Sequence, residues 1–214
     1  SDLATACERW SAAGVIGVDT EFVRERTFYP LPGLVAVADR DGVVLVDPIA
    51  VSDFGPLGAL VTDPSVTKLM HACDEDLDLL ELLTGAMPRG VLDTQLAAAF
   101  AGYGFSRSYG DMVEVLLDVK LDKGLTRSDW TRRPLSPEQL HYAALDVAYL
   151  LKMYERLSRE LEALNRVSWF TEECGNRHRA RVVDKLPERS HLRIRGRGKL
   201  LPAWHAVLRA LSQW

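Results

Sequence analysis

The sequence predicts an α/β fold in which strands come first and helices later. Three observations support this class. Short Val-rich runs near the N-terminus are bounded by turn residues, apolar residues farther along recur at helical spacing, and one late helix has a complete set of start signals. The 214 residues are 47% apolar and 26% charged, which is the composition of a globular protein with enough chain for a sizeable core.

The predicted strands are short and lie mostly in the first 70 residues. Asp41-Gly42 separates two of the Val-rich runs, and this dipeptide is typical of a tight antiparallel hairpin. We expect the strands at 15–19, 33–39, 43–47 and 67–71, with a brief extended piece at 91–92.

Helices predominate after residue 73. Ser136, Pro137 and Gln139 supply an N-cap, a proline at the first helical position and the glutamine of a capping box. We therefore expect a helix to begin there and to continue to about Leu164. The other helices are expected at 53–62, from Asp74 onward, at 94–101, 109–117 and 167–181, and, with an amphipathic pattern, from Leu200 onward.

Basic residues gather in the segment 177–199. Nine Lys or Arg and two acidic residues give this segment a charge of +7, whereas the rest of the chain has −11. Such a segment is typical either of a surface that binds a polyanion or of a solvated linker, and both interpretations stay open. We expect a first domain over 1–182, a basic linker over 183–198 and the first helix of a further domain over 199–214.

The cysteines and the apolar segments exclude several classes of protein. Cys7, Cys73 and Cys174 are scattered and odd in number, which argues against a disulfide framework or a zinc site and suits a reducing cytoplasm. The longest weakly polar stretch, 96–105, is too short to span a bilayer, and the first ten residues do not resemble a signal peptide. We therefore expect a cytoplasmic protein with no membrane partner.

Four acidic residues and one tyrosine are the candidates for chemistry. Asp19 and Glu21 point to the same side of a strand, and carboxylates that close need a cation or a shared proton. Asp76 lies in the first turn of a helix, and Tyr142 and Asp146 share one face of the well-capped helix. Taken singly, these features also fit a solvated strand end, an interaction with a helix dipole and a tyrosine packed in the core.

Together these residues resemble the DEDD superfamily of 3′→5′ exonucleases, in the subgroup whose last motif contains Tyr. The segments DTEFVRERTFYP, HACDEDLDLL, DTQLAAAF and LDKGLTRSDWTRRPLSPEQLHYAALDVAYL are similar to those of the ribonuclease D family, within residues 14–180. Ala36 departs from that family, in which many members have Gln. The resemblance implies a ribonuclease H-like mixed sheet flanked by helices, and then the start of a truncated helical HRDC-like domain at 199–214.

The resemblance also implies a metal-dependent 3′→5′ exoribonuclease that hydrolyses phosphodiesters at RNA 3′ ends, with tRNA 3′ maturation as its setting. Two Mg²⁺ or Mn²⁺ ions would serve it, and carboxylates are natural ligands for them. By the resemblance, Asp19 bridges both ions, Glu21 and Asp146 complete the site of the attacking water, and Asp76 supports the second ion. Tyr142 would orient the water, because a tyrosine pKa of about 10 disfavours proton abstraction at neutral pH.

The candidate substrate-binding residues are Thr20 and Phe22 beside the acids, together with Lys123, Arg127 and Trp130. Cations pair with phosphates, and aromatic rings stack on bases. The alternatives are a core position for Trp130 and a solvated one for Lys123. The expected partner is an RNA 3′ end, as in a tRNA precursor, and no protein partner is implied.

Two other functions stay open. One is a 3′→5′ DNA exonuclease, because contacts to the 2′-hydroxyl, which distinguish RNA from DNA, leave no pattern in the sequence. The other is a catalytically silent nucleic-acid-binding module, although a silent relative should have lost metal ligands that this sequence keeps. His71 is expected to have a packing or supporting role, since Mg²⁺ prefers oxygen ligands.

Overall fold

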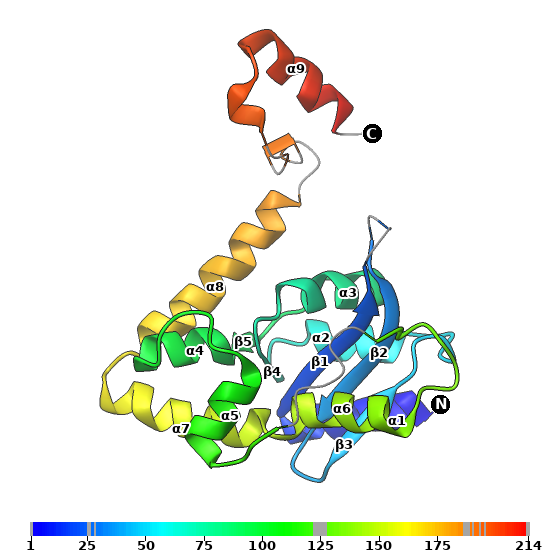
Figure 1. The fold of residues 1–214 in the computed structure, drawn as a ribbon, viewed down its shortest axis with the longest axis vertical. Helices are drawn as coiled ribbons and strands as arrows, with labels where there is room; N and C mark the ends of the chain where they lie inside the picture. The colour runs from blue at the N-terminus through cyan, green and yellow to red at the C-terminus, as the bar shows by residue number, and fades with distance from the viewer. Residues whose placement is uncertain are drawn as a thin grey trace. The chain divides into compact units, whose positions relative to one another are not determined.

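The computed structural model describes residues 2–24, 27, 29–121, 128–185, 189, 191–192, 194 and 196–212. The chain divides into two compact units, Ser1–Thr171 and Glu172–Trp214. In the described part of the first unit, a five-stranded sheet has the order β3-β2-β1-β4-β5 (Figure 1). The predicted α/β class is confirmed.

The sheet is mixed, and its central strand is the one that carries the first two candidate acids. β1 (Val15–Val23) pairs antiparallel with β2 (Leu31–Ala38) and parallel with β4 (Thr67–Met70). The edges are β3 (Val43–Val46), antiparallel to β2, and β5 (Val91–Asp93), parallel to β4.

β1 is longer than the sequence predicted. It continues past Asp19 to Val23, because β2 supplies antiparallel partners along its second half, with Asp19 opposite Ala36 and Glu21 opposite Leu34. Alternation along the strand directs Asp19 and Glu21 to one face of the sheet and Thr20 to the other.

The predicted β2–β3 hairpin is confirmed, and Asp39 stabilises its turn. The Asp39 carboxylate accepts hydrogen bonds from the backbone N–H groups of Asp41 (2.9 Å) and Gly42 (3.1 Å). Its second oxygen pairs with the Arg9 guanidinium at 2.8 Å. Arg9 belongs to α1 (Asp2–Ala13), a helix that the sequence analysis did not predict.

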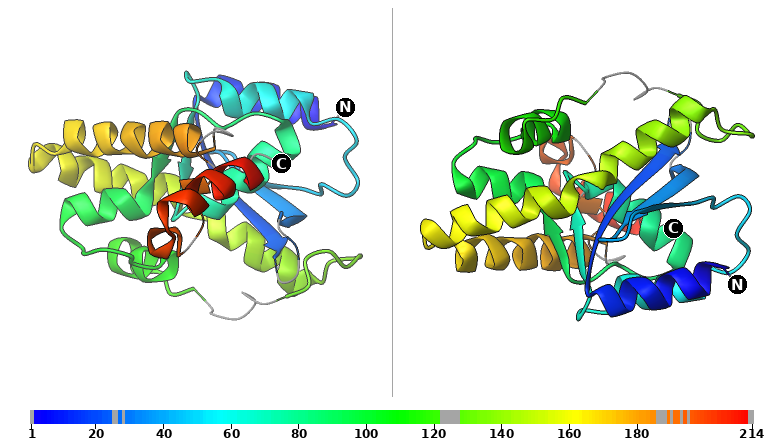
Figure 2. Two further views of the ribbon diagram at one scale, coloured as in Figure 1. Left: turned by 90° about the horizontal axis from the view of Figure 1, so that it is seen from above. Right: turned by 90° about the horizontal axis from the view of Figure 1, so that it is seen from below.

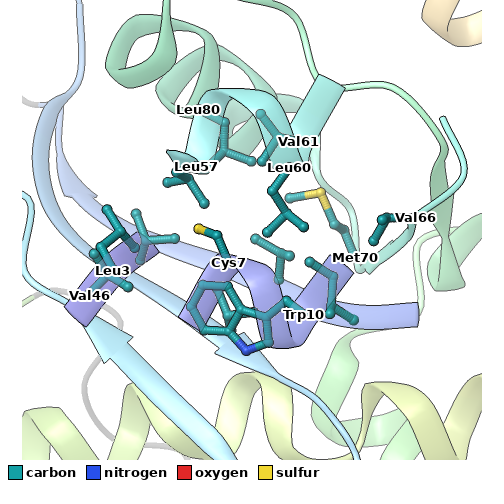
Figure 3. Packing of buried hydrophobic residues seen from close by; sticks show 14 of the residues in the cluster. Leu3, Cys7, Trp10, Val46, Leu57, Leu60, Val61, Val66, Met70 and Leu80 are labelled. Atoms are coloured by element: carbon teal, nitrogen blue, oxygen red, sulfur yellow. The ribbon is translucent and has the colours of Figure 1, made fainter. Parts of the chain in front are cut away.

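Helices cover both faces of the sheet. α1 and α2 (Gly55–Thr62) lie on one side of it, and α6 (Pro137–Ala148) crosses the other side (Figure 2). The first face has the larger core, in which Trp10 and Cys7 of α1 meet Leu57 and Leu60 of α2 (Figure 3). The remaining helices of the first unit are α3 (Asp74–Thr84), α4 (Thr94–Ala101), α5 (Tyr109–Leu117) and α7 (Leu150–Ala163), and α8 (Val167–Asp184) begins in it.

The start of the late helix is confirmed, but its predicted extent is wrong. Ser136 Oγ accepts from the Gln139 N–H (3.2 Å) and Gln139 Oε1 accepts from the Ser136 N–H (3.0 Å), which completes the capping box. Instead of continuing to Leu164, α6 ends at Ala148, and Tyr149 separates it from α7.

The second unit contains the end of α8, a short 3₁₀ helix (Arg197–Lys199) and α9 (Pro202–Leu211). Trp204, Val207 and Leu211 of α9 are exposed, and they follow the expected amphipathic spacing. The HRDC-like assignment and the domain bounds at 182 and 198 stay predictions. Within the described residues, no helix combines the length and the apolar character needed to cross a membrane.

A lysine lies in the core of the first unit. Lys68 of β4 is 0% exposed, and its ammonium group donates to the carbonyls of Asp63 (2.5 Å) and Val66 (2.8 Å). Burial lowers the pKa of Lys68 to about 8, because the charged form loses its hydration.

We expect the stability of the protein to increase through Lys68 as the pH rises from 8 toward 10.5. Between these values the unfolded chain binds more protons at this site than the folded one, so the free energy of unfolding rises with pH. Urea unfolding measures the free energy of unfolding of wild type and of Lys68→Met. Between pH 8 and 10.5 wild type should gain up to about 3 kcal/mol relative to the variant. A difference that is constant over this range would contradict the prediction.

Candidate metal centre

Three carboxylates from two elements meet on one face of the sheet. Asp19 and Glu21 of β1 and Asp146 of α6 each offer an oxygen atom, and these atoms lie within 4.8 Å of one another. α6 crosses this face, so its last turns bring Asp146 to the odd-numbered side chains of β1. Asp146 and the two strand acids are all partly buried.

Burial and mutual repulsion raise the pKa values of these acids. The pKa of Asp19 is raised well above its usual value by burial and then by Asp76, Asp146 and Glu21. Burial and the charges of Asp146 and Asp76 raise the pKa of Glu21 to about 8. Burial, with a smaller contribution from Asp76, raises the pKa of Asp146 to about 6. The site thus concentrates negative charge and oxygen ligands, which suits a hard divalent cation.

Asp76 approaches this cluster from the first turn of α3. Its Oδ1 atom accepts two hydrogen bonds from Thr20, one from the backbone N–H (3.2 Å) and one from the hydroxyl (2.5 Å). Burial raises the pKa of Asp76 to about 6, although the bonds from Thr20 oppose the shift. Both bonds from Thr20 go to the same carboxylate oxygen and fix the orientation of the Asp76 side chain.

The Thr20 side chain is buried, and a substrate-binding role for this residue stays a prediction. We expected it to bind substrate, but its side chain is 5% exposed and is bonded to Asp76. It lies between Asp19 and Glu21 and points to the opposite face, so one short segment of β1 supplies two acids and orients a third. The sequence indicated the alternation but not the partner.

Tyr142 lies one helical turn before Asp146. Its hydroxyl is hydrogen-bonded to the Asp146 carboxylate, and its pKa is raised by burial and by the charges of Asp146 and Glu21. A tyrosine in this environment is a neutral donor at physiological pH, which supports an orienting role rather than proton abstraction.

Trp130 is buried, contrary to the expectation that it stacks on bases. The side chain is 2% exposed and packs against Leu34 and Ala143, with its ring centre 6.2 Å from that of Tyr142. Gly33 makes this packing possible, because a Cβ atom there would collide with Trp130 Cβ and lie 2.8 Å from the Glu21 carbonyl oxygen. The alternative of a core position for Trp130 is the one that the structure supports.

An arginine that the sequence analysis did not consider holds Trp130 in place. The Arg133 guanidinium forms a bidentate pair with Asp47 (2.7 and 2.6 Å) at the end of β3. It also donates to the carbonyls of Gly33 (2.6 Å) and Trp130 (2.8 Å). Because Arg133 and Asp47 are 86 residues apart, nothing in the local sequence indicated their pairing.

The remaining candidates are less defined. Phe22 is partly buried beside Glu21, at the register irregularity of β1, and stays a substrate-binding prediction. Lys123 and Arg127 lie outside the described residues. His71 bonds to the Thr94 hydroxyl and to the Arg107 carbonyl oxygen, both at 2.9 Å, which fits the supporting role expected of it.

We expect metal binding to release a proton near neutral pH. With a pKa of about 8, Glu21 is largely protonated below that pH and must lose its proton to act as a ligand. Because the pKa of Asp19 is also raised well above its usual value, the apparent affinity for Mn²⁺ should rise by about tenfold or more per pH unit from pH 6 to 8. Calorimetry in buffers of different ionisation enthalpy measures both the affinity for Mn²⁺ and the number of protons released. An affinity that is independent of pH would contradict this linkage.

We expect Thr20→Val to lower the affinity for Mn²⁺ by about 10- to 100-fold, the usual effect of removing a partner that orients a metal ligand. Valine preserves the shape of the buried side chain and removes the hydroxyl bonded to Asp76. Thr20→Ser, which restores a hydroxyl, is the matched control and should bind nearly as well as wild type in calorimetry. Equal affinities in all three proteins would show that Thr20 does not orient Asp76 for metal binding.

Comparison with known proteins identifies the family. Residues 1–162 match the family model of a 3′-5′ exonuclease. Ribonuclease D of Pseudomonas paraeruginosa is 40% identical over 214 residues, which are 100% of this chain and 57% of that protein. The crystal structure of Escherichia coli RNase D, described as an exoribonuclease involved in structured RNA processing, superposes with a TM-score of 0.90 at 39% identity, over 99% of this chain and 56% of that one.

A more distant structure is that of Brucella melitensis NrnC with bound Mg²⁺. It has a TM-score of 0.70 and 28% identity, over 80% of this chain and 85% of that one. The chain spans little more than half the length of the ribonuclease D proteins that it matches. The predicted resemblance is confirmed: the chain belongs to the 3′-5′ exonuclease family, and its similarity to bacterial ribonuclease D extends along its whole length.

Proposed function

We propose that this chain carries the catalytic site of a metal-dependent 3′→5′ exoribonuclease. The observation that supports it most is the group of Asp19, Glu21 and Asp146, whose oxygen atoms lie within 4.8 Å of one another. Asp76, oriented by Thr20, and Tyr142, bonded to Asp146, complete the set of residues that the family resemblance implies.

The donor set fits divalent metal ions. All four acids offer hard oxygen ligands, and their raised pKa values show that the folded protein brings together negative charges that a cation would neutralise. We propose Mg²⁺ or Mn²⁺, as a pair, held by Asp19, Glu21, Asp146 and Asp76. When bound, such ions activate the attacking water and neutralise charge on the phosphate.

The chain's own residues orient the reactants. The neutral Tyr142 hydroxyl donates its one proton to the Asp146 carboxylate, and its oxygen is proposed to accept a hydrogen bond from the attacking water and so orient it. Trp130 packs beside the Tyr142 ring, and Arg133 connects the Trp130 backbone to Asp47 and Gly33. This packing limits the movement of the Tyr142 ring.

The proposed substrate is an RNA 3′ end, with tRNA precursors as the physiological class. The similarity to E. coli RNase D, whose structure is described in terms of structured RNA processing, supports RNA over DNA. Phe22, Lys123 and Arg127 are proposed to hold the strand, and the basic segment 177–199 is proposed as an additional RNA contact or a linker. The absence of a paired cysteine motif supports a cytoplasmic setting.

A catalytically silent module is the second candidate, and the site geometry argues against it. A binding module has no need to keep four acids in mutual repulsion, because each raised pKa is an energetic cost of folding with the acids ionised. The complete ligand set supports an active enzyme.

We expect wild type to shorten a 5′-labelled RNA oligomer from its 3′ end in Mg²⁺ or Mn²⁺ and to be inactive in EDTA. Asp146→Asn should lower the rate by more than about 100-fold, because it removes a proposed metal ligand itself, whereas removing a residue that only orients a ligand costs about 10- to 100-fold. Tyr142→Phe should keep measurable activity, with a loss of about 10- to 100-fold, since it removes only an orienting hydroxyl. A time course on denaturing gels, run beside DNA of the same sequence, measures the rate, direction and sugar preference.

Glu8→Gln is the matched control, because it neutralises an exposed acid of α1 on the opposite side of the sheet. It should cleave like wild type. Full activity of Asp146→Asn would reject the metal assignment, and tight RNA binding without cleavage by wild type would favour the silent module.

A further inference from the structure

The helix that carries Asp146 is interrupted at Tyr149, three residues after Asp146. The local sequence does not predict this interruption. α6 ends at Ala148 and α7 begins at Leu150, and Tyr149 between them has φ −108° and ψ −2°. The residues at the junction include neither Gly nor Pro, which cause most helix breaks. The break therefore needs a partner from another part of the chain.

That partner is the hydroxyl of Tyr109, the first residue of α5. In a continuous helix the Tyr149 N–H would donate to the Leu145 carbonyl four residues earlier. Here the Tyr149 N–H donates to Tyr109 Oη (3.1 Å), and the Tyr109 hydroxyl donates to the Leu145 carbonyl (3.0 Å). A single side-chain oxygen is thus inserted into one helical hydrogen bond.

The Tyr109 ring is itself held by neighbours. It meets the His71 ring edge to face, with 5.7 Å between the ring centres and an interplanar angle of 68°. His71 in turn bonds to the Thr94 hydroxyl at the start of α4 and to the Arg107 carbonyl just before α5, both at 2.9 Å. The inserted oxygen is therefore placed by β4, α4 and α5 together rather than by the helix that it interrupts.

The interruption lies where α6 and α7 approach the central strand. Leu150 is 1% exposed, and a Cβ atom added at Gly17 of β1 would lie 3.1 Å from Leu150 Cβ and 3.3 Å from the Val147 carbonyl oxygen. The last turn of α6 is thus fixed on two sides, by the sheet and by Tyr109. Asp146 is in this turn and directly follows Leu145, whose carbonyl the Tyr109 hydroxyl binds.

We propose that Tyr109 is a positioning residue for the metal centre: its hydroxyl, between the Leu145 carbonyl and the Tyr149 N–H, fixes the last turn of α6 so that Asp146 faces Asp19 and Glu21. The inference rests on the proposed function for its activity readout, whereas the metal-binding readout depends only on the carboxylate cluster.

Tyr109→Phe tests the hydroxyl separately from the ring. Phenylalanine keeps the packing on His71, and without the inserted oxygen Tyr149 N–H and Leu145 C=O are able to bond directly and straighten the helix. We expect the dissociation constant for Mn²⁺, measured by calorimetry, to rise by about tenfold or more, the range for residues that support metal ligands. The Mn²⁺ concentration for half-maximal RNA cleavage should rise by the same factor, with the KM for RNA unchanged at saturating Mn²⁺.

Tyr103→Phe is the matched control. It also removes a tyrosine hydroxyl, one that donates to Glu160 at 2.8 Å and so connects the α4–α5 segment to α7. This variant should bind Mn²⁺ like wild type, even where both variants have lower melting temperatures. A purely structural role for Tyr109 would lower its melting temperature and leave the Mn²⁺ affinity unchanged, and that result would overturn the proposal.

A second variant covers the case in which Tyr109→Phe does not fold. His71→Gln removes the ring against which Tyr109 packs while keeping polar atoms near Thr94 and Arg107, and we expect it to weaken Mn²⁺ binding by a smaller factor. Unchanged affinity in His71→Gln would then reject the positioning role. Wild type that binds Mn²⁺ but cleaves neither RNA nor DNA would contradict the proposed function alone, because the affinity comparison stands without activity.

Discussion

Repulsion among carboxylates is the constraint on which the rest of the structure depends. Oxygen atoms of Asp19, Glu21 and Asp146 lie within 4.8 Å of one another, and two unit charges at that separation repel by about 3 kcal/mol at an effective dielectric constant of about 20. Unless protons or cations compensate, the chain must hold these groups together against that force. Each element around the cluster contributes to this task.

The restraints come from backbone pairing and from hydroxyl groups rather than from the acids themselves. β2 holds the second half of β1 through antiparallel pairing, so Asp19 and Glu21 stay on one face. Thr20, from the same strand, holds Asp76 through two hydrogen bonds to its Oδ1 atom. The last turn of α6 is held between the Leu150–Gly17 contact and the Tyr109 hydroxyl. The acids are thus held in place by neutral hydrogen-bond donors and acceptors.

The sequence predicted those features that depend on interactions between neighbouring residues. The Asp41-Gly42 hairpin and the Ser136 capping box were predicted because turns and caps depend on adjacent residues. The acids were singled out by the resemblance of their motifs to the DEDD exonucleases, because their spacing alone also fits solvated or structural positions. The end of α6 depends on Tyr109, about 40 residues earlier, and no residue near the end of the helix predicts where it ends. The burial of Trp130 similarly depends on distant Gly33 and on the Arg133–Asp47 pair. α1 was missed although its buried residues Leu3, Cys7 and Trp10 recur at helical spacing, a pattern that the sequence analysis did not use.

The inserted hydroxyl has a consequence for how such a site evolves. One oxygen atom separates an interrupted helix from a continuous one, and Tyr109, which supplies it, lies on a different helix from Asp146. Selection for a different metal supply can therefore act on position 109 while every acid is preserved. Two homologues with identical catalytic motifs would then differ in their metal requirement, and a comparison of their ligands alone would give no reason for it.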